Sequence, residues 1–477
     1  MYHQKQTKTK IIATIGPACQ EKEVLRKLIH EGVDVCRLNF SHGKHEEHKK
    51  VIDTIKELNA EMGTSVAILA DLQGPKLRIG EVENNGVMLV DGALLSLVTT
   101  DVMGTATKVS ITYKPLPLDV MPGEFILVDD GKIKLEVVET NRKDEVVTRV
   151  ISGGILSSKK GVNLPNTKIS LPSLTEKDLE NANFVLDFDI DWIALSFVRS
   201  ASDIVTLKKL IGIKNKVTRV IAKIEKPEAI ADIDGIIEMA DGIMVARGDL
   251  GVEIPFDKVP VLQKTIINKC IIAAKPVIVA TQMMESMITN FRPTRAEATD
   301  VANAVMDGAD ALMLSGETSV GKYPAEVIRS MHQIISATEG SMFELVHPNI
   351  PNPSSENFLP DTICYNACKM ADLANAKGIV VFTSLGGSAY KIASNRPKAT
   401  IFAFTPNKEI ISQLNIAKGI KTHFLETKIS VNDAIQEATD ILKNSEHIQK
   451  GDVLVFVGGI PMREYGRINM MKISTVE

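Results

Sequence analysis

The feature that most constrains the fold is an alternation of short apolar runs with helical stretches, which occurs eight times along the 477-residue chain. The runs are rich in β-branched residues and nearly free of charge, as in residues 65–72 (SVAILADL) and 275–282 (KPVIVATQ). Parallel strands that are covered by helices on both faces need such continuous apolar sequence. Eight strand–helix units predict a closed (β/α)8 TIM barrel more strongly than an open sheet. We expect its strands at residues 11–15, 33–40, 66–72, 192–198, 220–225, 242–249, 276–281 and 311–315.

The alternation is interrupted once, between the third and fourth predicted strands. Residues 75–171 contain six short β-rich segments separated by turn pairs such as Asp91-Gly92 and Pro122-Gly123, which is typical of a small all-β barrel. This insertion leaves the larger barrel at the carboxyl end of a strand, where active sites of the fold lie. A domain in that place is positioned to act as a lid.

A third part follows a segment rich in Pro, Asn and Ser at residues 347–361. Strand-like and helical runs alternate beyond it and predict a doubly wound α/β domain of about five strands. We therefore expect three domains. They are a barrel of residues 1–74 and 172–346, a β-barrel lid of residues 75–171, and a C-terminal domain of residues 347–477 for regulation or assembly.

Composition excludes several classes of protein. The net charge is −4 and there is no basic excess, so the sequence does not favour nucleic acid as a partner. No window approaches the roughly 18 apolar residues of a membrane span, and the N-terminus lacks the apolar core of a signal peptide. The five cysteines include no Cys-x-x-Cys pair, which favours buried, reduced thiols. We expect a cytoplasmic protein without a membrane partner.

Polar side chains recur at the carboxyl ends of six of the eight predicted strands. A single such residue commonly caps a helix or pairs with a neighbour, whereas a charge inside a core is costly. Six strands with polar ends indicate a site, because the ends of a closed barrel converge on one mouth. These strand ends carry Arg37, Asn39 and Ser41; Asp71; Lys223 and Glu225; Arg247, Gly248 and Asp249; Thr281; and Ser315 with Glu317.

The residue types at this mouth indicate chemistry on a charged substrate. Glu225 and Asp249 are oxygen ligands on successive strands and suit a Mg²⁺ ion that keeps some of its waters. Lys223 lies two residues from Glu225 on the same strand face, where an ammonium group stabilises negative charge that develops during a reaction. Arg37 and Arg78 add cations that clamp phosphate oxygens.

A helix start adds a further anion-binding feature. Residues 248–251 (GDLG) open a helix, so we expect its free N–H groups to form an anion cradle. A metal ion, several cations and a helix N-terminus together imply a multiply charged anion. Phosphoryl transfer is the reaction class that fits best.

Six segments of the chain resemble the pyruvate kinase family, and the resemblance extends over essentially the whole sequence. The order barrel, lid, barrel and C-terminal domain is also that of the family. The matching segments are residues 37–43 (RLNFSHG), 159–165 (KKGVNLP), 223–225 (KIE), 244–251 (MVARGDLG), 280–283 (ATQM) and 314–318 (LSGET).

The resemblance implies transfer of a phosphoryl group from phosphoenolpyruvate to ADP, giving pyruvate and ATP in the last step of glycolysis. It implies Mg²⁺ as cofactor, with Mn²⁺ able to substitute, and a homotetramer. The resemblance implies that phosphoenolpyruvate contacts Arg37, Lys223, Gly248, Asp249 and Thr281, and that Lys223 stabilises the transferring group and the enolate. It implies that Glu225 and Asp249 are the Mg²⁺ ligands. It also implies that the nucleotide contacts Asn39, His42, Arg78 and Lys160.

One segment departs from the common family pattern. Many members hold K⁺ through the equivalents of Asn39, Ser41, Asp71 and the carbonyl of Leu72, beside a glutamate that is Lys76 here. A K⁺ ion and an ammonium a few ångströms apart repel by about 4 kcal/mol at an effective dielectric of 20. The segment resembles the branch of the family that works without K⁺, so we expect Lys76 to replace the ion. The alternative is that Lys76 points into solvent and K⁺ still binds.

The C-terminal domain carries a second departure. Members activated by a sugar phosphate use a loop rich in Ser, Thr and Gly, usually with a basic residue in it. Here the loop is residues 383–388 (TSLGGS), where Thr383, Ser384 and Ser388 supply hydroxyl groups but no cation occurs. Hydroxyl and N–H groups at a helix start can still bind a phosphorylated effector.

Two other functions fit part of the pattern. A metal-dependent barrel lyase or aldolase shares the carboxylates and the cation, but it explains neither the lid with Lys160 nor Arg78. An inactive scaffold on the same fold requires losses among Lys223, Glu225, Asp249 and Thr281, and none of these residues is missing.

Overall fold

The computed structural model describes residues 7–341, 349–426, 430–460 and 468–477. Its central element is a closed barrel of eight parallel strands in the order β1-β16-β15-β14-β13-β12-β3-β2. The (β/α)8 prediction is confirmed. The strands are β1 (Lys10–Ile15), β2 (Val35–Asn39), β3 (Ala67–Asp71), β12 (Trp192–Leu195), β13 (Arg219–Ile224), β14 (Gly242–Ala246), β15 (Val277–Ala280) and β16 (Ala311–Leu314).

Helices surround this barrel because the strands are apolar on both faces. Nearly every residue of the strands is buried, and their outward side chains form one hydrophobic cluster with the inner faces of the helices. The helices are α1 (Lys22–Glu31), α2 (His45–Met62), α4 (Glu176–Leu186), α5 (Ala201–Ile213), α6 (Pro227–Ala231), α7 (Ile233–Met239), α8 (Arg247–Glu253), α9 (Val259–Ile272), α10 (Arg295–Met306), α11 (Gly316–Ser319) and α12 (Pro324–Glu339).

The sixth barrel strand is shorter than the sequence predicted. We expected it to reach Asp249, but β14 ends at Ala246 and Arg247 begins α8. Hydrogen bonds explain the change of direction, because Arg247 donates to the carbonyl oxygens of Thr281 (2.9 Å) and Gln282 (3.3 Å) on the neighbouring strand end. Asp249 therefore lies in the first turn of a helix.

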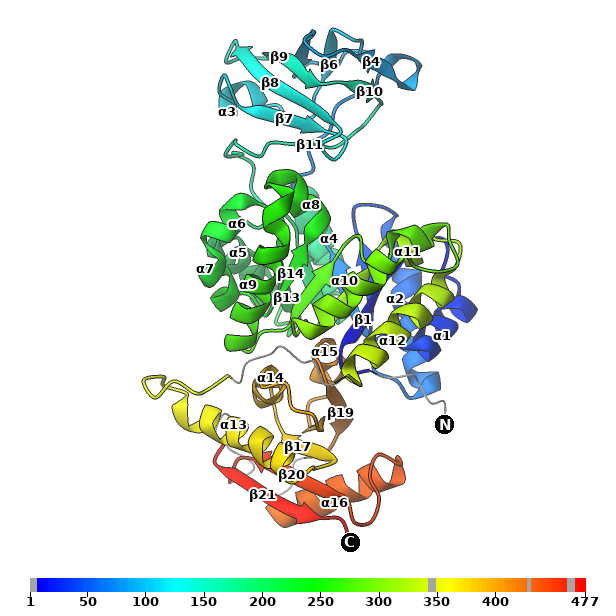
Figure 1. Ribbon diagram of the computed structural model, residues 1–477, viewed down its shortest axis with the longest axis vertical. Helices are drawn as coiled ribbons and strands as arrows, with labels where there is room; N and C mark the ends of the chain where they lie inside the picture. Colours follow the sequence, from blue (N-terminus) through cyan, green and yellow to red (C-terminus); the bar gives the residue numbers. More distant parts are fainter. Residues whose placement is uncertain (1–6, 342–348, 427–429, 461–467) are drawn as a thin grey trace.

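The insertion forms a separate β domain above the carboxyl ends of the barrel strands (Figure 1). We predicted a small barrel, but its main strands pair as an open six-stranded sheet in the order β11-β7-β8-β9-β5-β6, with a separate ribbon of β10 and β4. Closure is incomplete because residues 78 and 79 join the two edges by single bridges, Arg78 to Gly161 and Ile79 to Ile111. The elements are β4 (Val87–Leu89), β5 (Leu94–Val98), β6 (Lys108–Ser110), α3 (Leu116–Asp119), β7 (Phe125–Val128), β8 (Ile133–Thr140), β9 (Glu145–Ser152), β10 (Gly154–Leu156) and β11 (Val162–Asn163).

The C-terminal domain is a five-stranded sheet in the order β19-β18-β17-β20-β21, parallel except for β21. The predicted boundary at residues 346 and 347 lies outside the described residues. The predicted linker is too long at its other end, since α13 already begins at Phe358. The elements are α13 (Phe358–Leu373), β17 (Gly378–Phe382), α14 (Gly387–Ser394), β18 (Thr400–Thr405), α15 (Ile410–Gln413), β19 (Ile420–Phe424), α16 (Val431–Asn444), β20 (Val453–Gly458) and β21 (Met470–Thr475).

The C-terminal domain closes the amino end of the barrel, opposite the lid (Figure 1). Trp192, the single tryptophan of the chain, is fully buried, and its indole Nε1 donates to the carbonyl oxygen of Gln413 at 3.2 Å. Inward side chains of the barrel and the core of the C-terminal sheet belong to one hydrophobic cluster. The barrel mouth on the lid side is therefore the open end.

The described helices include none that is long and apolar enough to cross a membrane. All five cysteines are buried and unpaired, as the sequence predicted.

A half-buried histidine makes the C-terminal domain sensitive to acid. Burial, with smaller contributions from the nearby His447 and Lys421, lowers the pKa of His423 to about 4. Its ring stacks on Phe404 at a centroid distance of 5.1 Å. The folded state binds fewer protons than the unfolded state, so stability is complete above about pH 6.5 and falls as the pH drops toward 4.

We expect this effect to lower the free energy of unfolding by up to about 3 kcal/mol at pH 4, since one pKa unit corresponds to about 1.4 kcal/mol. The substitution His423→Phe keeps the ring stacking and should flatten the dependence between pH 6.5 and 4 in calorimetric scans. The exposed His30 provides the control, and His30→Phe should leave the profile unchanged. Equal pH profiles for native protein and His423→Phe would contradict this prediction.

Candidate active site

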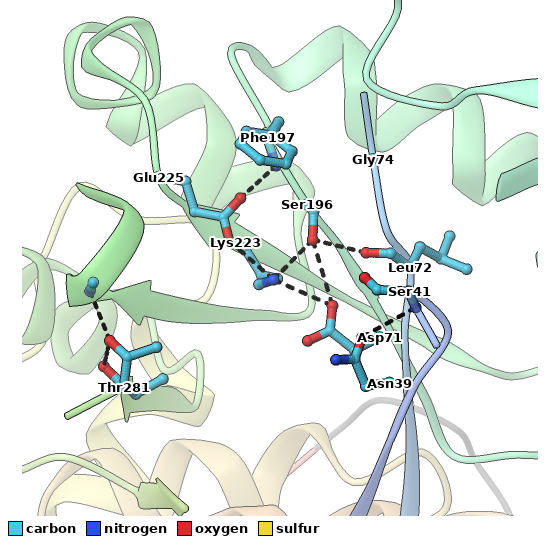
Figure 2. Close-up of polar contacts among 12 residues, drawn as sticks. Asn39, Ser41, Asp71, Leu72, Gly74, Ser196, Phe197, Lys223, Glu225 and Thr281 are labelled. Carbon is cyan, nitrogen blue, oxygen red and sulfur yellow. Dashed lines mark hydrogen bonds and ion pairs between the residues drawn. The ribbon is translucent and has the colours of Figure 1, made fainter. Parts of the chain in front are cut away.

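The barrel mouth gathers side chains from the ends of several strands (Figure 2). Arg37 lies on β2 and Asp71 ends β3, whereas Lys223 lies on β13 and Glu225 follows it. Asp71 and Glu225 are almost fully buried, with side chains 1% exposed. Buried carboxylates require paired cations, and the next contacts supply them.

Asp71 is the centre of this charge cluster. Its Oδ2 accepts from the Arg37 Nε at 2.7 Å, and its Oδ1 lies 3.3 Å from the Lys223 ammonium. Lys223 also contacts Glu225 Oε1 at 2.9 Å. Two cations and two carboxylates from three strands therefore form one network.

This network fixes the protonation of its members. Burial alone would raise the pKa of Asp71, but Lys223 and Arg37 hold it below its ordinary value. Burial would lower the pKa of Lys223, yet Asp71 and Glu225 raise it above its ordinary value. Lys223 is therefore a cation, and it faces the space above the barrel.

Glu225 and Asp249 have the properties of a divalent cation site. Burial raises the pKa of Glu225, and the negative charge of Asp249 also raises it. The ammonium of Lys223 acts in the opposite direction but does not cancel these effects. Asp249 is exposed, and its carboxylate forms no hydrogen bond with another described residue. A bound cation would remove the repulsion between these two carboxylates. The described residues hold no group of three or more His, Cys, Asp or Glu side chains that could bind a metal ion. A Mg²⁺ ion on these two carboxylates would therefore take further ligands from substrate and water.

Thr281 has a strained backbone that directs its hydroxyl group toward α8. Its φ of 68° is rare for a β-branched residue, and such strain is characteristic of functional sites. Its Oγ1 accepts from the Gly248 N–H at 2.7 Å and donates to the Ala280 carbonyl at 2.5 Å. The N–H of Gly248 thus donates to Thr281, and the anion cradle at this helix start stays a prediction.

The residues of the predicted monovalent-cation site lie together but are occupied by protein contacts. The Oδ1 of Asn39 accepts from the N–H of Ser41 at 3.1 Å. The carbonyl oxygen of Leu72 accepts from the Ser196 hydroxyl at 2.7 Å. Asp71 already faces two cations. Lys76 is exposed and contacts none of these groups, but it lies with Asp249 in the lining of a small cavity between barrel and lid.

The predicted nucleotide contacts come from the barrel (Asn39 and His42) and from the lid (Arg78 and Lys160). Arg78 donates to the carbonyl of Lys159 at 2.7 Å, and the Lys160 ammonium lies 2.8 Å from Asp129 Oδ1, so both side chains are held within the lid. His42 is exposed at the barrel rim. Partial burial lowers its pKa, and the charges of Lys76 and Arg78 lower it further. Positive charge therefore accumulates between barrel and lid.

Sequence reasoning missed two hydroxyl residues of the site. Ser196 follows β12 and accepts from the Lys223 ammonium at 2.8 Å, while it donates to the Leu72 carbonyl. Thr14 on β1 accepts from Arg37 Nη1 at 2.8 Å. The backbone N–H of Phe197 donates to Glu225 Oε2 at 2.8 Å. A lone serine or threonine in an apolar strand was the available signal, but it is weak because such residues commonly bond to backbone.

The predicted effector loop lines a cavity of about 570 Å³ next to the barrel. Its Ser384 and Ser388 lie in the lining, and the Thr383 hydroxyl accepts from the Gly386 N–H at 3.0 Å. The sequence showed no cation in this loop, but the fold brings three to the cavity. They are Arg219, Lys275 and Lys391, of which Arg219 donates to the loop carbonyl of Leu385 at 2.7 Å. The lining also contains the carboxylates of Asp241, Asp361 and Glu426, and Lys391 is paired with Asp361 at 2.9 Å.

Fold and site together define the class of protein. A closed (β/α)8 barrel with a buried cation between two carboxylates at its mouth, covered by a lid domain, fits a phosphotransferase. Comparison with known proteins identifies the family. A model of the pyruvate kinase barrel domain matches residues 6–328, and a model of the pyruvate kinase alpha/beta domain matches residues 361–474. The chain belongs to the pyruvate kinase family.

Individual relatives agree with this assignment. A pyruvate kinase of Geobacillus stearothermophilus is 43% identical over 98% of this chain and 80% of its own length. A pyruvate kinase of Corynebacterium glutamicum is 43% identical over 98% of this chain and 97% of its own length. The crystal structure of a pyruvate kinase from Cryptosporidium parvum, at 38% identity, superposes with a TM-score of 0.92 and covers 99% of this chain and 96% of its own.

The activity is accordingly that of a pyruvate kinase, a phosphotransferase that forms ATP and pyruvate from phosphoenolpyruvate and ADP in glycolysis. This family generally uses Mg²⁺ and K⁺. The comparisons favour this activity over the lyase and scaffold alternatives.

Ser196 provides a test of the charge network. The substitution Ser196→Ala removes one of three groups that surround the Lys223 ammonium, and loss of a hydrogen bond to a buried charge costs roughly 1.5–3 kcal/mol. We expect kcat to fall about 10- to 100-fold, with a smaller change in KM, in an assay of pyruvate formation. Ser202→Ala on the barrel surface is the control. An unchanged kcat for Ser196→Ala would show that this hydroxyl is dispensable.

Proposed function

We propose that phosphoryl transfer occurs at the cluster of Arg37, Asp71, Lys223 and Glu225, where Glu225 and Asp249 hold the metal ion. The observation that carries this proposal is the buried Lys223 ammonium, which two carboxylates keep charged at the barrel mouth. A Mg²⁺ or Mn²⁺ ion bound there supplies a positive charge that offsets the charge on the phosphoryl group. The protein groups then bind and orient the two substrates.

Arg37 and Lys223 bind the phosphoryl group of phosphoenolpyruvate in this proposal. The guanidinium of Arg37 has five N–H donors, and Asp71 and Thr14 use three of them. Two donors remain for phosphate oxygens. The three donors of Lys223 contact Ser196, Glu225 and Asp71, and the longest contact, 3.3 Å to Asp71, is the one that a phosphoryl oxygen replaces.

The transfer step breaks the bond between phosphorus and the enol oxygen, while an oxygen of the ADP β-phosphate forms the new bond to phosphorus. Lys223 stabilises the enolate that remains, because its charge is already fixed in the site. The enolate takes a proton at carbon from a water molecule beside Thr281. Gly248 and Thr281 position this side of the substrate, and Asn39, His42, Arg78 and Lys160 bind the nucleotide.

Replacement of the cation tests this mechanism. We expect Lys223→Met to lower kcat at least 10²- to 10³-fold, since the loss of one preorganised electrostatic group has that effect. The measurement is a coupled assay of pyruvate formed from phosphoenolpyruvate and ADP. Lys209→Met replaces an exposed barrel lysine and is the control. Removal of metal with EDTA should abolish activity, and Mg²⁺ or Mn²⁺ should restore it. Intact turnover in Lys223→Met would refute the proposed role.

We also propose that the enzyme belongs to the branch of the family that works without K⁺. The oxygen atoms of Asn39 and Leu72 accept hydrogen bonds within the protein, and Asp71 is neutralised by two cations. The ammonium of Lys76 adds positive charge beside Asp249 in the cavity between barrel and lid. Partial burial lowers the pKa of Lys76, and the charge of Arg78 lowers it further.

The K⁺ requirement can be measured directly. In tetramethylammonium buffer free of sodium, we expect the addition of K⁺ to change turnover less than twofold. The substitution Lys76→Glu introduces the residue found in K⁺-dependent relatives and should create a clear activation by K⁺. A strong K⁺ activation of the unmodified enzyme would rule out the proposal.

We propose roles for the other two domains as well. The lid of residues 75–171 covers the nucleotide, and the C-terminal domain of residues 347–477 takes part in regulation and in assembly of a homotetramer in the cytoplasm. The loop at Thr383, Ser384 and Ser388 binds a phosphorylated effector, a role that the hydroxyl groups of the loop and the nearby Arg219 support. A crystal soaked with sugar phosphates and AMP that leaves this cavity empty would count against the effector site.

A further inference from the structure

A buried ion pair lies beside the site, at the boundary of barrel and lid. The ammonium of Lys226 lies 2.6 Å from Glu253 Oε1, and the two side chains are 6% and 0% exposed. Lys226 directly follows Glu225 in the chain, and Glu253 ends α8, the helix that carries Asp249. The pair is therefore connected through the backbone to both proposed metal ligands.

Glu253 also binds the lid. The Nδ2 of Asn163, on β11, donates to the same Glu253 Oε1 at 2.8 Å. Figure 1 shows β11 at the edge of the lid that faces the barrel and α8. This hydrogen bond joins a lid strand to a barrel helix. The other carboxylate oxygen, Oε2, is buried and has no hydrogen-bond partner in the described part of the chain.

The buried pair of Lys226 and Glu253 is better suited to fix the position of neighbouring groups than to stabilise the fold. Desolvation of a buried ion pair cancels much of its attraction, so such pairs contribute little net stability, and a fixed arrangement is their best-attested benefit. The Lys226 ammonium lies 5.9 Å from the centroid of the Phe197 ring. The N–H of Phe197 donates to Glu225. The pair thus contacts one support of Glu225 and belongs to the helix of Asp249.

We propose that Asn163, Glu253 and Lys226 form a latch that sets the position of the lid over the two carboxylates, and that all three are positioning residues for the nucleotide. This inference rests on the proposed contact of Lys160 with the nucleotide. Lys160 precedes Asn163 by three residues, which span at most about 11 Å of chain. Anchoring Asn163 to α8 therefore limits where the Lys160 ammonium reaches relative to Asp249.

Kinetics of Asn163 variants test the latch, because these variants leave the buried ion pair intact. We expect Asn163→Ala to raise KM for ADP about 5- to 20-fold and to leave KM for phosphoenolpyruvate within twofold, since barrel groups hold that substrate. Asn163→Asp should have a larger effect, because it places a second carboxylate beside Glu253. Asn141→Ala changes a lid asparagine that bonds within its own turn, to Asp144, and should not alter either KM.

A measurement of the distance between lid and barrel tests the latch independently of the proposed contact between Lys160 and the nucleotide. The five native cysteines are buried, so spin labels can be placed at the exposed positions Lys143→Cys in the lid and Lys209→Cys in the barrel. We expect Asn163→Ala to broaden the distribution of label distances and shift it to longer values. An unchanged distribution would overturn the latch. A changed distribution with an unchanged KM for ADP would support the latch and count against the proposed role of Lys160.

Discussion

The buried carboxylate of Asp71 is the interaction on which the site depends. It separates two cations, Arg37 and Lys223, that would otherwise repel each other inside the barrel. It also joins three strands, since Arg37 lies on β2, Asp71 on β3 and Lys223 on β13. The geometry of the mouth is thus set by charge balance as much as by the packing of apolar side chains.

The distribution of apolar and polar residues assigns different tasks to the two ends of the barrel. The amino end is filled by Trp192 and is continuous with the core of the C-terminal sheet. The carboxyl end holds the charges and opens toward the lid (Figure 1). The packed amino end therefore holds the barrel together, and the carboxyl end leaves room for substrates to enter. Thr281 and the adjacent Gln282, whose φ is 52°, lie at this open end. Their strained backbone lowers the stability of the fold but fixes the direction of the side chains at the mouth.

The sequence allowed the barrel, the insertion and the C-terminal sheet to be predicted, because apolar periodicity is a local property that follows directly from burial on one or both faces. It also allowed Lys223, Glu225 and Asp71 to be placed together, since strand ends of a closed barrel must converge. Ser196 and Thr14 were missed, because a hydroxyl group gains its role only from the partner that the fold brings to it.

The remaining errors have the same origin in long-range contacts. The length of the sixth strand depends on hydrogen bonds from Arg247 to the neighbouring strand end. Two of the cations near residues 383–388, Arg219 and Lys275, come from the barrel and cannot be read from the loop itself. The roles of the individual residues follow from the family resemblance and from chemistry.

Strand β13 has a further consequence for communication within the molecule. Its first residue, Arg219, bonds to the carbonyl of Leu385 in the C-terminal domain, and Lys223 follows four residues later. Four residues of extended chain span about 13 Å. The strand is hydrogen-bonded on both sides, to β12 and β14, which restricts its movement along its own axis. A single strand thus connects the cavity beside the C-terminal domain to the charge cluster at the barrel mouth.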